Sequence, residues 1–184
     1  MKRAFLIHGW EGYPEEAWRP WLKTELLYQG FEVLIPAMPD TNQPRMDAWV
    51  QHLSEIVGTP DDECIFVGHS LGCIAILRYL ETLKEGQIIG GVVMVAGFTD
   101  NLGHKELDSF FQTEINWEKI KRHCRKFVAI HSDNDPYVPA THGQIFKEKL
   151  NAAFIIQKGM KHFSGDDGIT ELPIVLDAVT KIVE

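Results

Sequence analysis

The chain has 184 residues, 45% of them apolar and 24% charged, which is enough to build one hydrophobic core. Its net charge of −8 disfavours nucleic acid and anionic membranes as main partners, because both are bound through basic patches. The three cysteines form no paired motif, so we expect neither a disulfide framework nor a zinc site. No apolar run approaches the roughly 18 residues of a membrane span, and we expect a cytoplasmic protein.

Short apolar runs alternate with segments of helical periodicity along the chain. The runs are rich in Val, Ile, Leu and Phe without polar alternation, which is typical of strands buried on both faces. In chain order we expect a strand at 4–8, a helix at 15–28, a strand at 32–36, a helix at 45–57, a strand at 64–68 and a helix at 71–83. There follow a strand at 91–96, an irregular segment at 98–121 with a short helix near 114–123, a strand at 127–131, a helix at 139–150, a strand at 154–157 and a helix at 169–183.

This alternation predicts an α/β fold, with a doubly wound, mostly parallel six-stranded sheet and helices on both faces. We expect residues 1–184 to form a single domain, because no repeat, low-complexity segment or linker interrupts the pattern. The irregular segment at about 98–121 is long and aromatic, and loops of this kind often cover functional clefts.

The sequence GHSLG at 68–72 lies between a predicted strand and a predicted helix. In this position G-x-S-x-G indicates a nucleophile elbow, a tight turn that lifts the serine hydroxyl to the carboxyl edge of the sheet. Gly68 and Gly72 leave the space that side chains would otherwise fill around Ser70. The alternative is an ordinary strand–helix turn in which Ser70 caps the helix.

A serine hydroxyl becomes a good nucleophile only when a base removes its proton and an acid orients that base. The stretches HSDNDPYVP at 131–139 and KGMKHFSG at 158–165 each follow a predicted strand, so they lie at the same sheet edge as Ser70. They offer Asp133 or Asp135 as the acid and His162 as the base, in the order expected for this fold. Other histidines lie on strands or helices or precede the acid, and the ring of His69 must point away from Ser70.

An oxyanion formed during acyl transfer needs backbone N–H donors. Leu71 directly follows the nucleophile and supplies one donor. The loop after the first strand, HGWEG, supplies the other, and we assign it to the N–H of Trp10. His8, in the same loop, is expected to hold the loop in place without transferring protons.

These motifs together resemble the α/β-hydrolase superfamily, and within it the small family of retinoblastoma-binding protein 9 and its bacterial relatives. The resemblance rests on FLIHGWEG, PAMPDTNQPRMDAWV, FVGHSLG, VAGFTD, SDNDPYVP and GMKHFSG, which are spread over nearly the whole chain. It implies a compact serine hydrolase and favours Asp135 over Asp133 as the acid. The L-x-C-x-E sequence linked to retinoblastoma protein is not present, because Ala75 stands where the glutamate would be.

We therefore predict a serine hydrolase with the triad Ser70, Asp135 and His162, which cleaves small esters, or amides, through an acyl-enzyme. No metal or organic cofactor is required. Candidate residues for the substrate-binding wall are Trp10, Phe98, Phe110 and Phe163, and the small chain favours a shallow cleft and short acyl groups. The alternative function is a non-catalytic protein-interaction module on a hydrolase fold.

Overall fold

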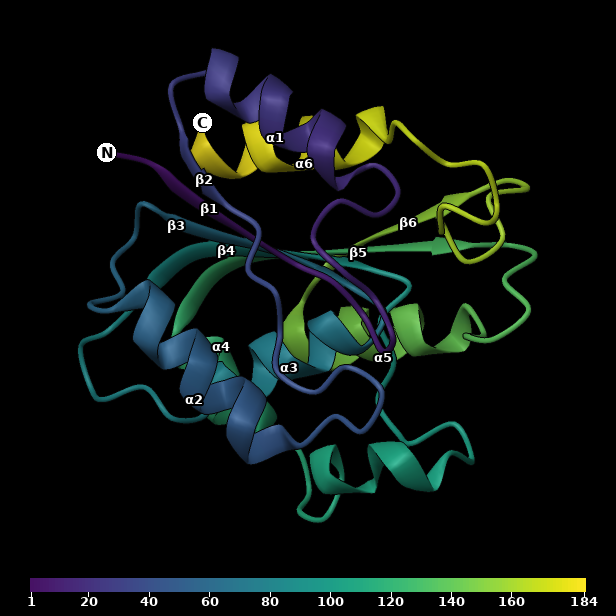
Figure 1. The fold of residues 1–184 in the computed structure, drawn as a ribbon. Coiled ribbons are helices and arrows are strands. Elements are labelled where there is room, and N and C mark those ends of the chain that lie inside the picture. Colours follow the sequence, from purple (N-terminus) through teal and green to yellow (C-terminus); the bar gives the residue numbers. More distant parts are fainter.

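The computed structural model describes residues 1–184, and its centre is a twisted sheet of six strands (Figure 1). The strands run in the order β2-β1-β3-β4-β5-β6, and every neighbouring pair is parallel. Their bounds are β1 (Arg3–Ile7), β2 (Glu32–Leu34), β3 (Cys64–His69), β4 (Ile89–Val95), β5 (Cys124–Ser132) and β6 (Ala153–Gln157). The α/β class, the six strands and the doubly wound arrangement are confirmed, and the sheet is parallel throughout.

Helices cover both faces of the sheet. One face carries two helices, α1 (Arg19–Tyr28) and α6 (Pro173–Val183), as the upper layer of Figure 1 shows. The opposite face carries α2 (Met46–Val57), α3 (Leu71–Leu80), α4 (Trp117–Arg122) and α5 (Thr141–Leu150). No helix is long and apolar enough to cross a membrane.

Successive strand residues point to opposite faces, so each strand contributes to two hydrophobic cores. In β1, Phe5 and Ile7 pack into the core under α2 and α3. Ala4 and Leu6 pack into the core under α1 and α6. Because both faces of the inner strands are buried, these strands are almost entirely apolar, and this explains the absence of polar alternation in the sequence.

Two helices begin four residues later than their periodicity predicts, and a proline sets the start of each. α1 begins at Arg19 with Pro20 in its first turn, and α6 begins at Pro173. Proline has no N–H to donate. It is tolerated in the first turn of a helix, because the N–H groups there have no intrahelical acceptor. The predicted starts at 15 and 169 would have placed these prolines inside a helix.

The irregular segment at 98–121 contains a 3₁₀ helix that the sequence did not indicate, η1 (Lys105–Phe110). Phe110, at its end, is fully buried and meets Trp49 of α2 edge to face at 5.8 Å. The carbonyl of Phe110 also accepts a hydrogen bond from the Nε of Arg78 on α3, at 2.8 Å. The end of η1 therefore packs against α2 and α3.

The strand order reverses between β1 and β3, because the chain passes from β1 outward to β2 and then returns to the other side of β1. In open parallel sheets, ligands bind in the crevice at the carboxyl ends of the strands beside such a reversal. The loops after β1 and β3 carry Trp10 and Ser70, so the fold brings these two residues to that position.

Candidate active site

Ser70 occupies a sharp turn between β3 and α3. Its φ of 52° and ψ of −120° lie in a region that residues other than glycine rarely adopt. Its N–H donates to the carbonyl oxygen of Val95 at 2.9 Å, which ties the turn to β4. The side chain of Ser70 caps no helix N–H, so the alternative of a capping serine does not hold.

The two glycines of the turn have no room for a side chain. A Cβ on Gly68 would lie 2.7 Å from the backbone nitrogen of Cys73. A Cβ on Gly72 would overlap the carbonyl oxygen of Ile7 and lie 2.7 Å from that of His8. The glycines therefore let α3 start directly beside the end of β1, which holds the Ser70 turn against the loop that carries Trp10.

His162 connects Ser70 and Asp135 in one hydrogen-bonded line. Its Nε2 lies 3.0 Å from the Oγ of Ser70, and its Nδ1 lies 2.8 Å from the Oδ2 of Asp135. The Asp135 side chain is 1% exposed and that of His162 is 13% exposed, so the line runs from the buried carboxylate outward to the serine. This spacing matches what a nucleophile, a base and an orienting acid need.

The two candidate acids take different positions. The Oδ1 of Asp135 accepts hydrogen bonds from the N–H groups of Tyr137 and Val138, at 2.9 and 3.0 Å, which leaves Oδ2 for His162. The Oδ1 of Asp133 instead accepts the N–H of Gly159 at 2.8 Å. Only Asp135 contacts the imidazole, and Asp133 holds the start of the loop that carries His162.

Further polar side chains hold this loop, which spans residues 158–172. At the end of β5, Ser132 Oγ accepts the N–H of Met160 at 3.0 Å, and just after the strand Asn134 Oδ1 accepts that of Lys161 at 2.9 Å. Asp167 Oδ2 accepts the N–H of His162 itself at 3.0 Å. Burial alone would raise the pKa of Asp167, but hydrogen bonds from Ser164 and the His162 N–H outweigh it and lower that pKa. Sequence reasoning did not predict this network, although Ser, Asp and Asn after a strand are the residues that bond loop N–H groups.

His69 supports the same loop from inside the elbow. Its Nε2 lies 2.7 Å from the carbonyl oxygen of His162, and its ring packs on the His162 ring with centroids 5.0 Å apart. Burial, and then the proximity of the His162 imidazole, lowers the pKa of His69 well below its usual value. The neutral ring donates its Nε2–H to the His162 carbonyl. His69 makes no hydrogen bond with Ser70, and its contact with His162 is a feature that the sequence did not indicate.

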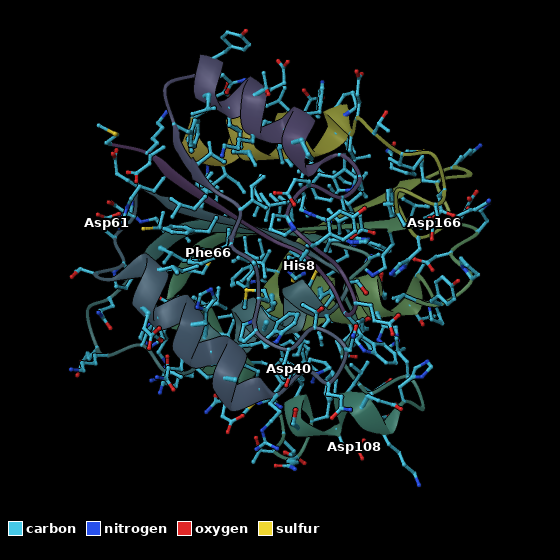
Figure 2. All side chains as sticks on the ribbon, in the orientation of Figure 1. His8, Asp40, Asp61, Phe66, Asp108 and Asp166 are labelled. Carbon is cyan, nitrogen blue, oxygen red and sulfur yellow. The ribbon has the colours of Figure 1, made fainter.

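His8 fixes the loop that would supply the second oxyanion donor. Figure 2 shows His8 deep between the helix layers, with Asp166 far out on the loop that carries His162. Burial lowers the pKa of His8, so the ring is neutral. Its Nδ1–H donates to the Gly9 carbonyl at 3.0 Å, and its Nε2 accepts the Met38 N–H at 3.1 Å. Both ring nitrogens are occupied, as a purely structural role requires.

The expected oxyanion donors lie beside the nucleophile. A Cβ built on Gly9 would lie 3.0 Å from the Cβ of Ser70, so the backbone leading into Trp10 passes close to the serine. The N–H of Trp10 donates to no group in the protein. Leu71 is the first residue of α3, and its N–H has no intrahelical acceptor. Both N–H groups are therefore free to bind an oxygen atom near Ser70.

Comparison with known proteins identifies the family. A family model described as serine hydrolase matches residues 4–181. YdeN of Bacillus subtilis (strain 168) is 36% identical over 180 residues, which cover 97% of this chain and 95% of YdeN. The crystal structure of the B. subtilis ydeN gene product matches with a TM-score of 0.95 at 35% identity, covering 100% of this chain and 99% of that one. The serine hydrolase RBBP9 of Rattus norvegicus is 28% identical over 163 residues, 87% of this chain and 81% of RBBP9.

The chain belongs to the serine hydrolase family. The resemblance read from the motifs is thereby confirmed, and so is the prediction that the protein is an enzyme. Its structure has the α/β-hydrolase fold.

Three of the four residues that we expected to line the substrate-binding site of this hydrolase are buried in its cores. Phe98, Phe110 and Phe163 are at most 2% exposed and belong to the two hydrophobic cores. Rings that are fully packed in the core offer no surface to a substrate. Trp10 is half-buried, and its ring meets that of His104 edge to face at 5.3 Å. Trp10 therefore remains the candidate wall residue, with His104 of the segment at 98–121 beside it.

No thiol of the hydrolase competes with Ser70 as a nucleophile. All three cysteines are buried and unpaired. Burial raises the pKa of Cys64 to about 11, and it raises the pKa of Cys73 and Cys124 further. A thiol is reactive as the thiolate, so these groups are protonated and inert at neutral pH. No group of three or more His, Cys, Asp or Glu side chains is placed to hold a metal ion.

Proposed function

We propose that this serine hydrolase cleaves small carboxylic esters, with small amides as the second substrate class, through Ser70, His162 and Asp135. The observation that carries the proposal is the continuous line from Asp135 through His162 to Ser70, with contacts of 2.8 and 3.0 Å. In the same proposal, residues 1–184 form one hydrolase domain. The molecule that this domain binds is a small-molecule substrate, as the family indicates.

In the proposed reaction, the Oγ of Ser70 attacks the carbonyl carbon while the Nε2 of His162 takes the hydroxyl proton. Asp135 holds the Nδ1–H and stabilises the imidazolium that forms. The oxyanion accepts hydrogen bonds from the N–H groups of Trp10 and Leu71. His162 then gives its proton to the leaving alcohol, and an acyl-Ser70 ester remains. Water, deprotonated by His162, hydrolyses this ester and restores the free enzyme.

Short acyl groups fit this site best. Four cavities of about 320–570 Å³ lie elsewhere in the protein, and neither Ser70 nor His162 lines any of them. The three phenylalanines that could have walled a long tunnel are packed in the cores. The methylenes of a long acyl chain would therefore stay in water and add little binding energy.

A fluorophosphonate probe tests the nucleophile, because it labels an activated serine. We expect the wild-type protein to be labelled and Ser70→Ala not to be, while Ser54→Ala, on the exposed side of α2, labels like wild type. Hydrolysis of p-nitrophenyl acetate should fall about 10⁴-fold or more in Ser70→Ala. Equal hydrolysis by a folded Ser70→Ala protein would reject Ser70 as the nucleophile. A wild-type protein that is neither labelled nor active would instead favour a non-catalytic interaction module.

A series of p-nitrophenyl esters from acetate to palmitate tests the acyl preference. We expect kcat/KM to be highest for chains of about two to four carbons, since longer chains gain no buried surface. A maximum at palmitate would reveal an apolar tunnel and contradict the assignment of small substrates, without affecting the role of Ser70.

A further inference from the structure

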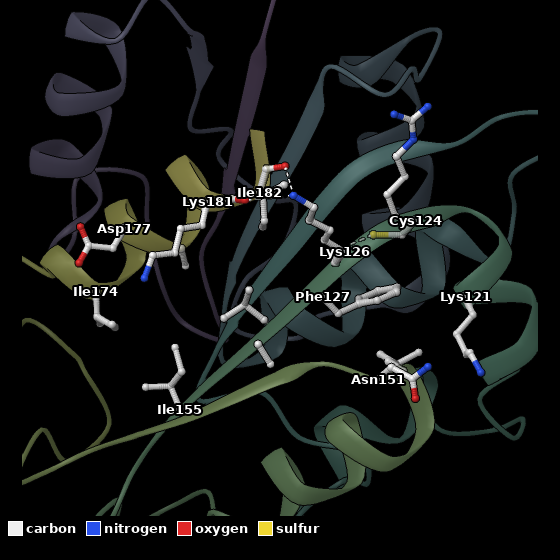
Figure 3. A pocket seen from close by; sticks show the side chains of 15 residues that line it. Lys121, Cys124, Lys126, Phe127, Asn151, Ile155, Ile174, Asp177, Lys181 and Ile182 are labelled. Carbon is white, nitrogen blue, oxygen red and sulfur yellow. Dashed lines mark hydrogen bonds between the residues drawn. The ribbon is translucent and has the colours of Figure 1, made fainter. Parts of the chain in front are cut away.

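A cavity lined mostly by apolar side chains lies away from Ser70, at the amino-terminal part of β5 and β6. It has a volume of about 560 Å³, within the range of roughly 300–1,000 Å³ that ligand pockets occupy. Figure 3 shows its walls: α6 with Ile174, Asp177, Lys181 and Ile182 on one side, and Ile155 of β6 on the other. We call this cavity the α6 groove.

The groove exists because α6 lies over β4 and leaves β5 and β6 partly uncovered. A Cβ on Gly91 of β4 would lie 2.6 Å from the Cγ2 of Ile182, so the helix sits directly on that strand. Val128 of β5 and half-buried Ile155 of β6 face the same side and form the floor beyond it. The result is an apolar trough at the edge of the sheet.

The charges around the α6 groove are opposite to those of the protein as a whole. Four cations line it, Lys121, Arg125, Lys126 and Lys181, with a single carboxylate, Asp177, although the chain has a net charge of −8. Such a local reversal of sign attracts anions to this one place.

The four cations are not equally available. The Nζ of Lys126 donates to the carbonyls of Lys181 and Ile182, at 3.1 and 3.0 Å, and so caps the end of α6. Arg125 forms an ion pair with Asp62 at 2.7 Å, and Lys121 lies 3.6 Å from Glu118. Lys181 has no ion pair, since no carboxylate oxygen lies within the 4.0 Å that defines one. Its exposed ammonium group lies beside the apolar lining of the groove, so it is the cation that is available to bind an anion.

We propose that the α6 groove is a second, non-catalytic site that binds an aliphatic monoanion, with its hydrocarbon chain on Val128, Ile155 and Ala178 and its charged head on Lys181. The site is separate from Ser70, because it lies at the amino-terminal part of the sheet and Ser70 lies at the carboxyl edge. The pairing of an apolar trough with one free cation selects a ligand that has both an alkyl chain and a negative charge.

Titration calorimetry with octanoate, decanoate and octylammonium, all below their micelle concentrations, tests this proposal. We expect octanoate to bind, decanoate to bind more tightly by about fourfold for each added methylene that is buried, and octylammonium not to bind. Lys181→Glu should weaken decanoate binding about tenfold or more, because it reverses the charge at the head-group position. Lys84→Glu makes the same change on an exposed lysine outside the groove and should leave binding unchanged.

Amide chemical shifts locate the ligand on the folded protein. Decanoate should shift the amides of Val128, Ile155 and Ala178 in both wild type and Ser70→Ala. Shifts confined to the surroundings of Ser70 and His162 would overturn the proposal, and so would equal binding of octylammonium or an unchanged affinity in Lys181→Glu. Sedimentation analysis that shows a dimer broken by Lys181→Glu, without ligand binding, would assign the groove to a second copy of the chain instead.

Discussion

Ser70 is held in a backbone conformation that costs about 1–3 kcal/mol for a residue with a side chain. The surroundings hold it there: its N–H bonds to Val95, and the glycines on either side allow β1 and α3 to close around it. The strain places the hydroxyl 3.0 Å from His162 instead of folding it back onto the helix as a cap. In the proposed mechanism this positioning is what makes the serine reactive.

The two aspartates after β5 allow a matched test of the acid. Asp135→Asn should lower kcat about 10⁴-fold, because an amide at this position favours the wrong tautomer of the imidazole. Asp133→Asn should cost less than tenfold, since its amide oxygen can still accept the Gly159 N–H. The comparison uses ester hydrolysis by both purified variants, with circular dichroism to show that both are folded. A larger loss in Asp133→Asn would reverse the assignment.

His69 gives a second test, because it contacts the backbone carbonyl and the ring of His162 without a hydrogen bond to Ser70 or Asp135. His69→Phe removes the donor to the His162 carbonyl and should lower kcat about tenfold or more through misplacement of the base, with KM nearly unchanged. His69→Gln keeps a side-chain N–H and should recover part of the loss. The measurement is the separate determination of kcat and KM for a short ester.

A purely structural His69 would give a different pattern. Both variants would then lower the melting temperature by similar amounts, and kcat below that temperature would stay at the wild-type value. Such a result would remove His69 from the support of His162.

At the scale of elements, the closest approach in the site is between α3 and the end of β1, and Gly72 makes it possible. Gly72→Ala should destabilise the protein by about 1–3 kcal/mol or more, because the added methyl overlaps backbone carbonyls that cannot rotate away. Gly165→Ala is the matched control, since its Cβ would meet nothing closer than 3.6 Å. Urea unfolding followed by tryptophan fluorescence measures both. Equal stability of the two variants would show that α3 can shift away from β1 at little cost.

The strands of this fold are predictable from the sequence, whereas several boundaries and contacts are not. The inner strands β1, β3 and β4 are buried apolar runs, and in a parallel sheet the residues after the strands gather at one edge. The sequence alone therefore brings together Ser70, the two aspartates after β5 and His162. The helix starts at Arg19 and Pro173 are also readable, since a proline marks each, but helical periodicity by itself extends both helices too far toward the N-terminus.

The direction in which a side chain points cannot be predicted from the sequence alone. Nothing in the sequence says that Phe110 turns toward Trp49 in the core instead of toward a cleft, because both positions are apolar. The choice between Asp133 and Asp135 likewise depends on which loop N–H groups come within reach, and in the sequence it rests on the family resemblance. The contact of His69 with His162 joins residues 93 positions apart and carries no local signal.

In the whole molecule, the candidate active site and the α6 groove lie at opposite ends of the sheet. The carboxyl edge carries Ser70 and the loops around it, and the α6 groove lies toward the other end, where β5 and β6 extend past the helix. The four histidines whose pKa is lowered are His8, His69, His131 and His142, and burial is the first cause for each. They hold loops at the carboxyl edge, and the stability of that edge therefore depends on their remaining neutral.

This dependence predicts that the protein loses stability in mild acid. The folded-state pKa of each of the four histidines lies below its unfolded value of about 6.5, so the unfolded chain binds more protons as the pH falls through that value. The free energy of unfolding should thus be highest above about pH 7 and should fall toward pH 5.5, by up to about 1.4 kcal/mol per pH unit for each histidine. Urea unfolding between pH 7.5 and 5.5 measures this slope in a range above the usual titration of carboxylates. His142→Gln should make the slope shallower, and a free energy that does not change across this range would show that these rings accept protons without unfolding the protein.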